Sequence, residues 1–318
     1  MADGADHVRR IHGYRVGAPV ELEGVRERGV DAPLDITITE VDHLDGADDE
    51  HRQVLSHDFP GGQFVKASMD DDGAVTVDFS STSRFRISGR QDRIEMSVRD
   101  PSDRGTAIVL LQGWVMAMTV MLRGGVVLHA SAVEAAGRGV AFLAHSGMGK
   151  STVTAMAVRD GGTLVSDDVL RVEVVDGAVR AHPGLTAIRL RPAAGLLADT
   201  IPGVTVSETA DGRILARVER DDGGPVPLAA VLVPLPSRDT DHLEVKWLDP
   251  PIAAVELNEY PRVYDWHVTG PQRRQFEVTA EMAESVPVGL LSIPWGPPWP
   301  DDFLGDVLDL LDRHEVAR

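Results

Sequence analysis

The segment 144–152 (AHSGMGKST) constrains the fold of this chain most, because its glycines and lysine predict a phosphate-binding loop. The apolar run 140–144 predicts a buried strand before the loop, and 151–158 can form the helix that such a loop requires. In this arrangement backbone N–H groups and the helix N-terminus face an anion, and the Lys150 ammonium reaches the β- and γ-phosphates. The sequence therefore predicts an α/β fold with a nucleotide site at this loop.

The segment departs from the pattern G-x-x-x-x-G-K-[ST] at its first position, where Ala144 replaces glycine. Gly147 and Gly149 partly compensate, because they keep the backbone close to the anion. An incidental lysine in a glycine-rich turn is the alternative, but the chain has only two other lysines. The predicted nucleotide-binding residues are Ser146, Gly147, Met148, Gly149, Lys150, Ser151 and Thr152, with the Ser151 hydroxyl also a ligand for Mg²⁺.

Composition limits the other classes of function. The 318 residues suit two domains, and 43% hydrophobic residues are enough to build ordinary cores. A net charge of −19 argues against a nucleic-acid or anionic-membrane partner, both of which require basic surfaces. Without cysteine there is no disulfide, thiolate metal site or cysteine nucleophile. The first 16 residues lack the apolar core of a secretory signal, so we expect a cytoplasmic protein.

The chain divides into an expected β-rich N-terminal domain of unknown role, residues 1–104, and a second domain, residues 105–318. The apolar run 108–122 is shorter than the roughly 20 residues that span a membrane, and a buried helix over 105–123 is expected instead. Alternating patterns and turn signals predict strands at 34–39, 64–66, 75–79, 85–87, 126–134, 163–166, 169–175, 178–181, 204–209, 213–218, 231–233 and 243–248, and helices at 279–285 and 302–314.

Two carboxylates, Asp167 and Asp168, follow the predicted strand 163–166. Neighbouring residues within a strand point to opposite faces, so both side chains reach one site only if the strand has ended there. One carboxylate can then hold Mg²⁺ and the other can accept a proton from an attacking hydroxyl. The alternative is an exposed acidic turn in a chain with 50 acidic residues.

His129 lies in the predicted strand 126–134, which a turn at 135–139 connects to the strand entering the loop. Pairing of these strands would place His129 near the phosphates, although the standard mononucleotide unit enters its loop from a parallel βαβ arrangement. A buried histidine without a chemical role is the alternative. Together with the acid pair, His129 can orient or polarise a carboxylate through a hydrogen bond.

These segments together resemble the catalytic domain of HPr kinase/phosphorylase: LHASAV at 128–133, SGMGKS at 146–151 and VSDDV at 165–169. The resemblance covers about residues 105–318 and implies the P-loop core that this family shares with phosphoenolpyruvate carboxykinases. It also implies phosphorylation of a protein serine with ATP and Mg²⁺. By position it implies active-site roles for His129 and Lys150, Mg²⁺ at Ser151 and Asp167, and Asp168 as proton acceptor, although the order of the two aspartates is left open.

The segments 182–192 and 285–288 look more like divergent HPr-kinase-related proteins found near peptide-modification genes, some of which modify a serine of a small biosynthetic peptide. Thr152 stands where the bifunctional enzymes usually have Glu, and their glycine-arginine-asparagine segment is missing, so neither phosphorylase activity nor HPr as substrate is expected. Arg189 and Arg191 can clamp phosphate, with structural salt bridges as the alternative. The related enzymes assemble into rings, which makes a homo-oligomer one expectation.

The sequence thus predicts an HPr-kinase-like phosphotransferase that uses ATP and Mg²⁺ on the serine of a peptide or small protein. A kinase of a small hydroxyl metabolite is the second hypothesis. A regulatory module that binds nucleotide without transfer is the third. The acid pair and His129 favour catalysis, because binding alone does not need a base.

Overall fold

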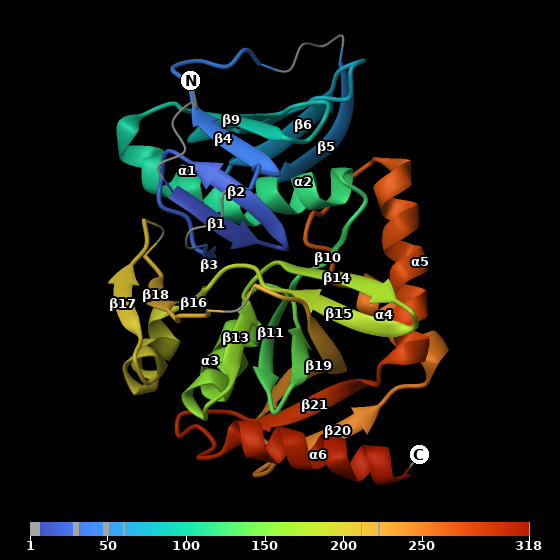
Figure 1. Ribbon diagram of the computed structural model, residues 1–318. Coiled ribbons are helices and arrows are strands. Elements are labelled where there is room, and N and C mark those ends of the chain that lie inside the picture. Colours follow the sequence, from blue (N-terminus) through green and yellow to red (C-terminus); the bar gives the residue numbers. More distant parts are fainter. Residues whose placement is uncertain are drawn as a thin grey trace.

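The computed structural model describes residues 7–27, 32–46, 51–59, 61–210, 212–221 and 223–317. These residues form a mixed α/β structure with two nine-stranded sheets and one three-stranded sheet. In Figure 1 the N-terminal sheet lies at the top, the central sheet below it, and the small sheet to one side.

The N-terminal sheet has the strand order β3-β1-β2-β4-β9-β8-β7-β6-β5. In β8 the residues Ser83, Phe85 and Ile87 are buried while the arginines between them are not, which is the period of two expected of a strand with one face on a core. The four strands predicted here correspond to β4, β6, β7 and β8. The nine strands are β1 (His7–Ile11), β2 (Tyr14–Ala18), β3 (Val25–Arg26), β4 (Ile36–Glu40), β5 (Arg52–Asp58), β6 (Phe64–Met69), β7 (Val75–Phe79), β8 (Ser83–Ile87) and β9 (Arg93–Val98).

The apolar helix follows a short 3-10 turn, η1 (Pro101–Asp103), and consists of α1 (Arg104–Leu110), the π-helical segment η2 (Leu111–Val115) and α2 (Met116–Leu122). Its buried residues, Leu111 and Val115 among them, belong to the same core cluster as Phe85 of the N-terminal sheet. The buried helix is therefore present, and it packs on the N-terminal sheet, while a domain boundary at residue 105 stays a prediction. Of the described helices, only this one, taken over Pro101–Leu122, is long and apolar enough to cross a membrane; 61% of its apolar window is buried, as in the core helix of a soluble fold.

The central sheet has the order β10-β14-β15-β19-β12-β11-β13, with β21 beside β19 and β20 beside β21. Strand β12 (Arg138–Leu143) pairs antiparallel with β11 (Ala130–Ala135) and parallel with β19 (Val226–Ser237). Val140 and Phe142 face the cluster formed with α3 and α6, whereas Ala141 and Leu143 face the cluster formed with α4 and α5. Burial on both faces explains why this strand is a continuous apolar run.

The predicted strand 126–134 is interrupted, which corrects the expectation of one strand. β10 (Val126–Leu128) pairs with β14, whereas β11 pairs with β12 and β13, and His129 lies between the two strands. The backbone N–H of His129 instead donates to the carbonyl of Tyr260 at 3.1 Å. The chain thus changes partner strands at His129, and this break presents the histidine beside the loop rather than within a ladder.

Several other elements were missed or predicted too short. Helix α4 begins with two prolines, which is a helix-start signal, and α5 is much longer than the predicted 279–285. The remaining elements are α3 (Lys150–Arg159), β13 (Thr163–Ser166), β14 (Leu170–Val175), β15 (Ala178–His182), β16 (Ala187–Leu190), η3 (Pro192–Thr200), β17 (Thr205–Glu208), β18 (Ile214–Arg217), β20 (Glu244–Trp247), α4 (Pro250–Asn258), α5 (Thr269–Ser285), β21 (Val288–Pro294) and α6 (Phe303–Ala317).

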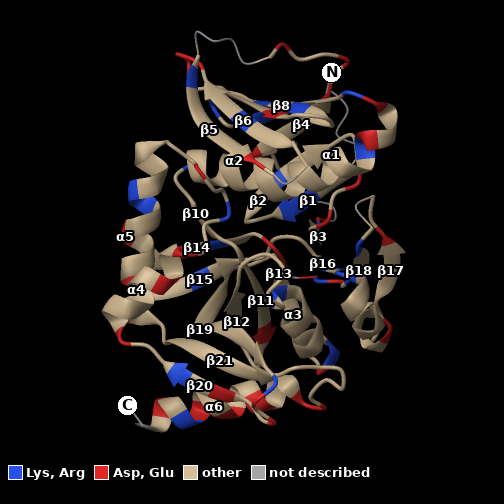
Figure 2. Ribbon diagram, turned by 180° about the vertical axis from the view of Figure 1, so that it is seen from behind, with Lys and Arg blue, Asp and Glu red and all other residues tan. Residues whose placement is uncertain are grey.

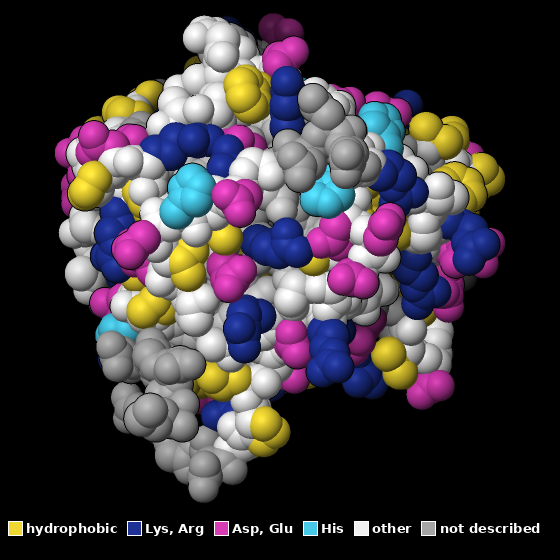
Figure 3. Space-filling view, turned by 90° about the horizontal axis from the view of Figure 1, so that it is seen from above, with side chains coloured by type: hydrophobic (Ala, Val, Ile, Leu, Met, Phe, Trp, Pro, Cys, Tyr) yellow, Lys and Arg dark blue, Asp and Glu magenta, His cyan; other side chains and the backbone are white. Residues whose placement is uncertain are grey.

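Charged residues of both signs are distributed over the described surface. Acidic and basic residues occur together along α6 and α5 (Figure 2). From above, Lys and Arg side chains are interspersed with Asp and Glu over the N-terminal face (Figure 3). The expected absence of nucleic-acid and membrane partners stays a prediction from the net charge.

Candidate functional site

The glycine loop connects β12 to α3, in the predicted strand–loop–helix order. Gly147 and Gly149 adopt φ values of +89° and +91°, a left-handed region that favours glycine. A Cβ on Gly147 would also lie 2.7 Å from the Arg191 guanidinium. Ala144 is buried and has no positive φ, so the first position of the motif tolerates its Cβ here.

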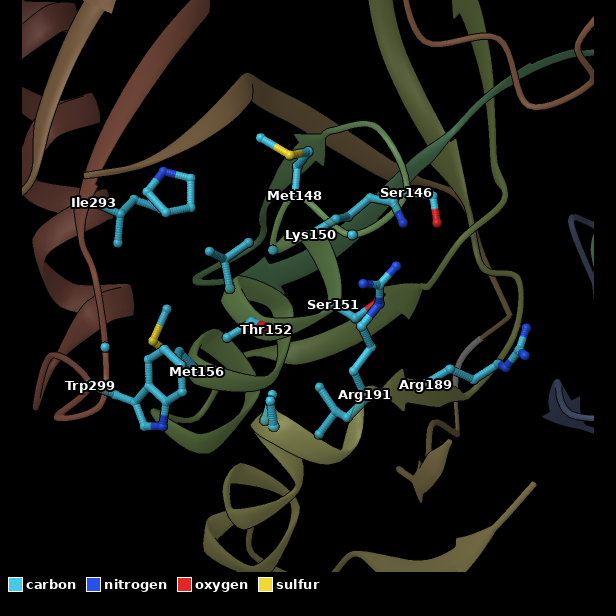
Figure 4. Close-up of a pocket in the computed structure, with 18 of the residues that line it drawn as sticks. Ser146, Met148, Lys150, Ser151, Thr152, Met156, Arg189, Arg191, Ile293 and Trp299 are labelled. Carbon is cyan, nitrogen blue, oxygen red and sulfur yellow. The ribbon is translucent and has the colours of Figure 1, made fainter. Parts of the chain in front are cut away.

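A cavity of about 510 Å³ opens over this loop, a volume within the range of small-molecule sites. Side chains from α3, β16, η3 and the C-terminal end of β21 line it (Figure 4). The structure brings every site residue predicted from the sequence to this one cavity: His129, Ser146, Gly147, Met148, Gly149, Lys150, Ser151, Thr152, Asp167 and Asp168. Their individual roles stay predictions.

The cavity has an apolar end away from Lys150. Met156 of α3, Ile293 of β21 and Trp299 line it there, and Trp299 lies beside Met156 in Figure 4. An indole ring and a polarisable thioether offer a surface on which a planar ring can pack. Arg191 lines the cavity next to the loop, and its guanidinium is therefore close enough to contact a phosphate bound there, as predicted.

Asp168 lies at the centre of a charged cluster. Its Oδ1 is 3.1 Å from His129 Nε2 and 3.9 Å from Lys150 Nζ, and its Oδ2 accepts a 2.8 Å hydrogen bond from the guanidinium of Arg262. Burial opposes ionisation, but the charges of Arg262 and Lys150 and the contact with His129 hold the pKa of Asp168 well below its usual value. Asp168 is therefore ionised at neutral pH.

At His129, burial and the neighbouring cations both lower the pKa, whereas at Asp168 they have opposite effects on the pKa. Burial first, and then the charges of Lys150 and Arg262, lower the pKa of His129 against the opposing effect of Asp168. The Tyr264 hydroxyl lies 3.5 Å from Nδ1, on the other side of the ring. His129 is thus neutral at pH 7 and presents one ring nitrogen to Asp168.

Asp167 lines the same cavity but contacts a different set of groups from Asp168. Its Oδ1 accepts a hydrogen bond from the Ser131 hydroxyl, and its Oδ2 accepts the backbone N–H of Arg189 at 3.0 Å. The Ser151 hydroxyl lies 3.2 Å from both carboxylate oxygens. Both aspartates reach one cavity because β13 ends at Ser166 and Asp168 adopts a φ of +72°. The strand end that the acid-pair hypothesis required is therefore present.

The oxygens of Ser151 and Asp167 fit a magnesium ion that takes its other ligands from phosphate and water. Mg²⁺ in nucleotide sites is held by one or two protein oxygens and the substrate phosphates. Within the described ranges, no group of three or more His, Asp or Glu side chains could hold a metal by itself.

Sequence reasoning missed Arg262, the strongest partner of Asp168. Arg262 follows α4, is 7% exposed, and lies with its guanidinium carbon 5.5 Å from the centre of the Trp114 ring. No motif or spacing connects it with the loop, because 94 positions separate it from Asp168. Ser131 was also missed, although it lies two residues after His129 in the predicted strand 126–134, and this spacing, which puts both on one face of a continuous strand, was a usable signal.

Comparison with known proteins shows only a distant similarity. No protein-family model and no curated protein matches the chain. Among solved structures, the HPr(Ser) kinase/phosphatase from Coxiella burnetii aligns with 12% identity and a TM-score of 0.30, over 60% of this chain and 97% of that one. The functional inference accordingly rests on the geometry of the site.

Proposed function

We propose that this chain is a phosphotransferase that uses ATP and Mg²⁺ to phosphorylate a hydroxyl, with a serine of a peptide or small protein as the acceptor. One observation carries the proposal: a single cavity joins the glycine loop with Lys150, the oxygen pair of Ser151 and Asp167, and the Asp168 carboxylate between His129 and Lys150. The resemblance of these segments to HPr kinase supports the same assignment.

The nucleotide would lie along the cavity, with its phosphates at the loop and its base against Met156 and Trp299. The amides at the start of α3 and the ammonium of Lys150 would hold the phosphates. Arg191, next to Gly147, would add a second positive charge. Bound Mg²⁺ would neutralise charge on the phosphates, with Ser151 and Asp167 as its protein contacts.

In the reaction, the serine Oγ would form a bond to the γ-phosphorus while the bond from that phosphorus to the bridging oxygen of ADP breaks. The proton of the serine hydroxyl would pass to an aspartate carboxylate and then to solvent. The low pKa of Asp168 makes it a weak base, but a loose phosphoryl-transfer transition state needs positioning more than proton abstraction. Asp168 would therefore act chiefly by orienting the hydroxyl.

Two substitutions test the proposal. Lys150→Ala and Asp168→Asn should each abolish transfer from γ-labelled ATP while the far-UV circular dichroism spectrum stays unchanged. Lys246→Ala is the matched control, because this lysine is exposed on β20 and does not line the cavity. Near-wild-type transfer by either site variant would refute the assignment.

The low pKa of Asp168 makes this carboxylate a weak base, and this observation also favours the alternative of a non-catalytic nucleotide-binding module. Incubation with γ-labelled ATP, Mg²⁺ and host extract separates the candidates. Label in a macromolecule supports the proposal, and label in a small molecule supports a metabolite kinase. Nucleotide binding without transfer supports the regulatory module.

A further inference from the structure

A second cavity, of about 250 Å³, adjoins the nucleotide cavity at Asp168. Asp168 and Arg189 line both cavities. The other walls come from the chain between β2 and β3, from the helix of α1 and η2, and from β17 and β18 of the small sheet. A group in this second cavity would therefore approach Asp168 without crossing the nucleotide.

The apolar helix of α1, η2 and α2, which packs on the N-terminal sheet and is called the N-terminal helix below, lines the second cavity with one face. Gly105, Ile108, Val109 and Gln112 all line it, and their spacing of i, i+3, i+4 and i+7 places them in one row along a helix. Leu111, on another face, is fully buried in the core of the N-terminal sheet. The helix thus has one face for its own core and another for the cavity.

The N-terminal helix is π-helical at η2, where it passes Asp168 and Arg262. Within η2, Gly113 lies so close to Arg262 that a Cβ there would be 2.6 Å from Nη2, and 3.6 Å from Asp168 Oδ2. Trp114 contacts the same guanidinium, and the Gln112 side chain accepts a 2.6 Å hydrogen bond from the backbone of Glu23. π-Helical segments within α-helices occur frequently at functional sites. This one fits the N-terminal helix against Asp168 and its arginine.

Acidic side chains form part of the rim of the second cavity. Glu21, Glu23 and Glu208 line it, against Arg189 and Arg217. Glu23 is already paired with Arg217 at 2.8 Å, but Glu208 is exposed and forms no ion pair with any described residue. An acceptor with a positive charge near its hydroxyl would complement this rim.

We propose that the second cavity binds the acceptor segment, that the N-terminal helix selects it, and that the acceptor carries a Lys or Arg beside the phosphorylated serine. The proposal rests on the proposed function and adds the acceptor class to it. The serine hydroxyl would reach Asp168 from the second cavity, past the wall that Gly113 forms. The basic neighbour would lie against Glu208.

The test uses a synthetic peptide library with one central serine and degenerate flanking positions, incubated with the full chain, Mg²⁺ and γ-labelled ATP. We expect at least tenfold enrichment of Lys or Arg at one flank in the phosphorylated pool. Glu208→Gln should reduce that enrichment at least threefold while total incorporation changes less. Phosphorylation without a basic preference, or a preference unchanged by Glu208→Gln, would overturn the inference and leave the proposed function standing.

Two glycine variants test the location of the acceptor. Gly105 and Gly270 are each the second residue of a helix, but a Cβ on Gly105 would lie 3.1 Å from Ala210, whereas Gly270 has nothing within 4 Å. Gly105→Leu should lower kcat/KM for the library peptides at least tenfold without changing the Kd of a fluorescent ATP analogue, and Gly270→Leu should change neither. Unchanged kcat/KM in Gly105→Leu would also overturn the inference. Wild-type protein that binds the analogue but phosphorylates neither library nor extract would overturn the proposed function and this inference with it.

Discussion

His12 should make the stability of this protein strongly dependent on pH. It lies in the turn between β1 and β2, is fully buried, and neither ring nitrogen has a hydrogen-bond partner among the described residues. Its backbone ties the N-terminal sheet to the other half of the chain, because its N–H donates to the carbonyl of Pro183 and its own carbonyl accepts from Arg171, both at 2.7 Å. Burial, and then the charges of Arg171, His182 and Arg262, lower its pKa from 6.5 to about 3.

The sign of the effect follows from proton linkage. Between pH 3 and 6.5 the unfolded chain binds a proton at His12 that the folded chain does not bind, so the folded state loses stability as pH falls below 6.5. With 1.36 kcal/mol per pKa unit, lowering the pH from 7 to 5 costs about 2 kcal/mol at this residue.

Urea unfolding of the wild type and of His12→Asn at pH 7 and pH 5 measures this contribution. Asparagine does not titrate and tolerates the φ of +53° at this position, which precedes Gly13 in the hairpin turn. The loss of unfolding free energy between the two pH values should be about 2 kcal/mol smaller in the variant, whatever its stability at pH 7. His129 and His182, whose pKa values are also lowered, contribute equally to both proteins and cancel. Equal losses in the two proteins would refute the reasoning.

Three further predictions concern the loop, the base site and the core. Gly147→Ala should weaken nucleotide binding at least tenfold by equilibrium titration, because it combines a positive φ with a clash at Arg191, whereas Gly161→Ala, which has a positive φ in open space, should leave binding unchanged. Trp299→Ala should weaken ATP binding by about 1–3 kcal/mol, the usual contribution of base stacking, and leave the affinity for inorganic tripolyphosphate unchanged; equal losses for both ligands would place the base elsewhere. Phe142→Ala should lower the free energy of unfolding by about 3–5 kcal/mol, since this side chain is fully buried between α3 and α6; a urea-unfolding loss below 1 kcal/mol would contradict the packing described.

Local signals accounted for the loop and its flanks. The apolar run 140–144 and the glycines before Lys150 predicted strand, turn and helix because each depends on residues close in sequence. Asp167 and Asp168 were placed at a strand end by the same kind of signal. One predicted strand, 126–134, was wrongly continuous, because the chain leaves it at His129 to contact Tyr260; α4 and the first part of α5 were not predicted.

The sequence by itself therefore determined the glycine loop, its strand and helix, and the polar site residues of its cavity, but not the apolar end at Met156, Ile293 and Trp299. Only the tertiary structure decided that Arg262 neutralises Asp168, that a π-helical segment brings Gly113 against this pair, and that a second cavity opens beside it. These contacts join segments far apart in the chain. Arginine and glycine are common in this sequence, so their presence alone does not indicate which of them form the contacts. Local propensity acts over a few residues, whereas an ion pair or a cavity wall depends on which surfaces the packed core brings together.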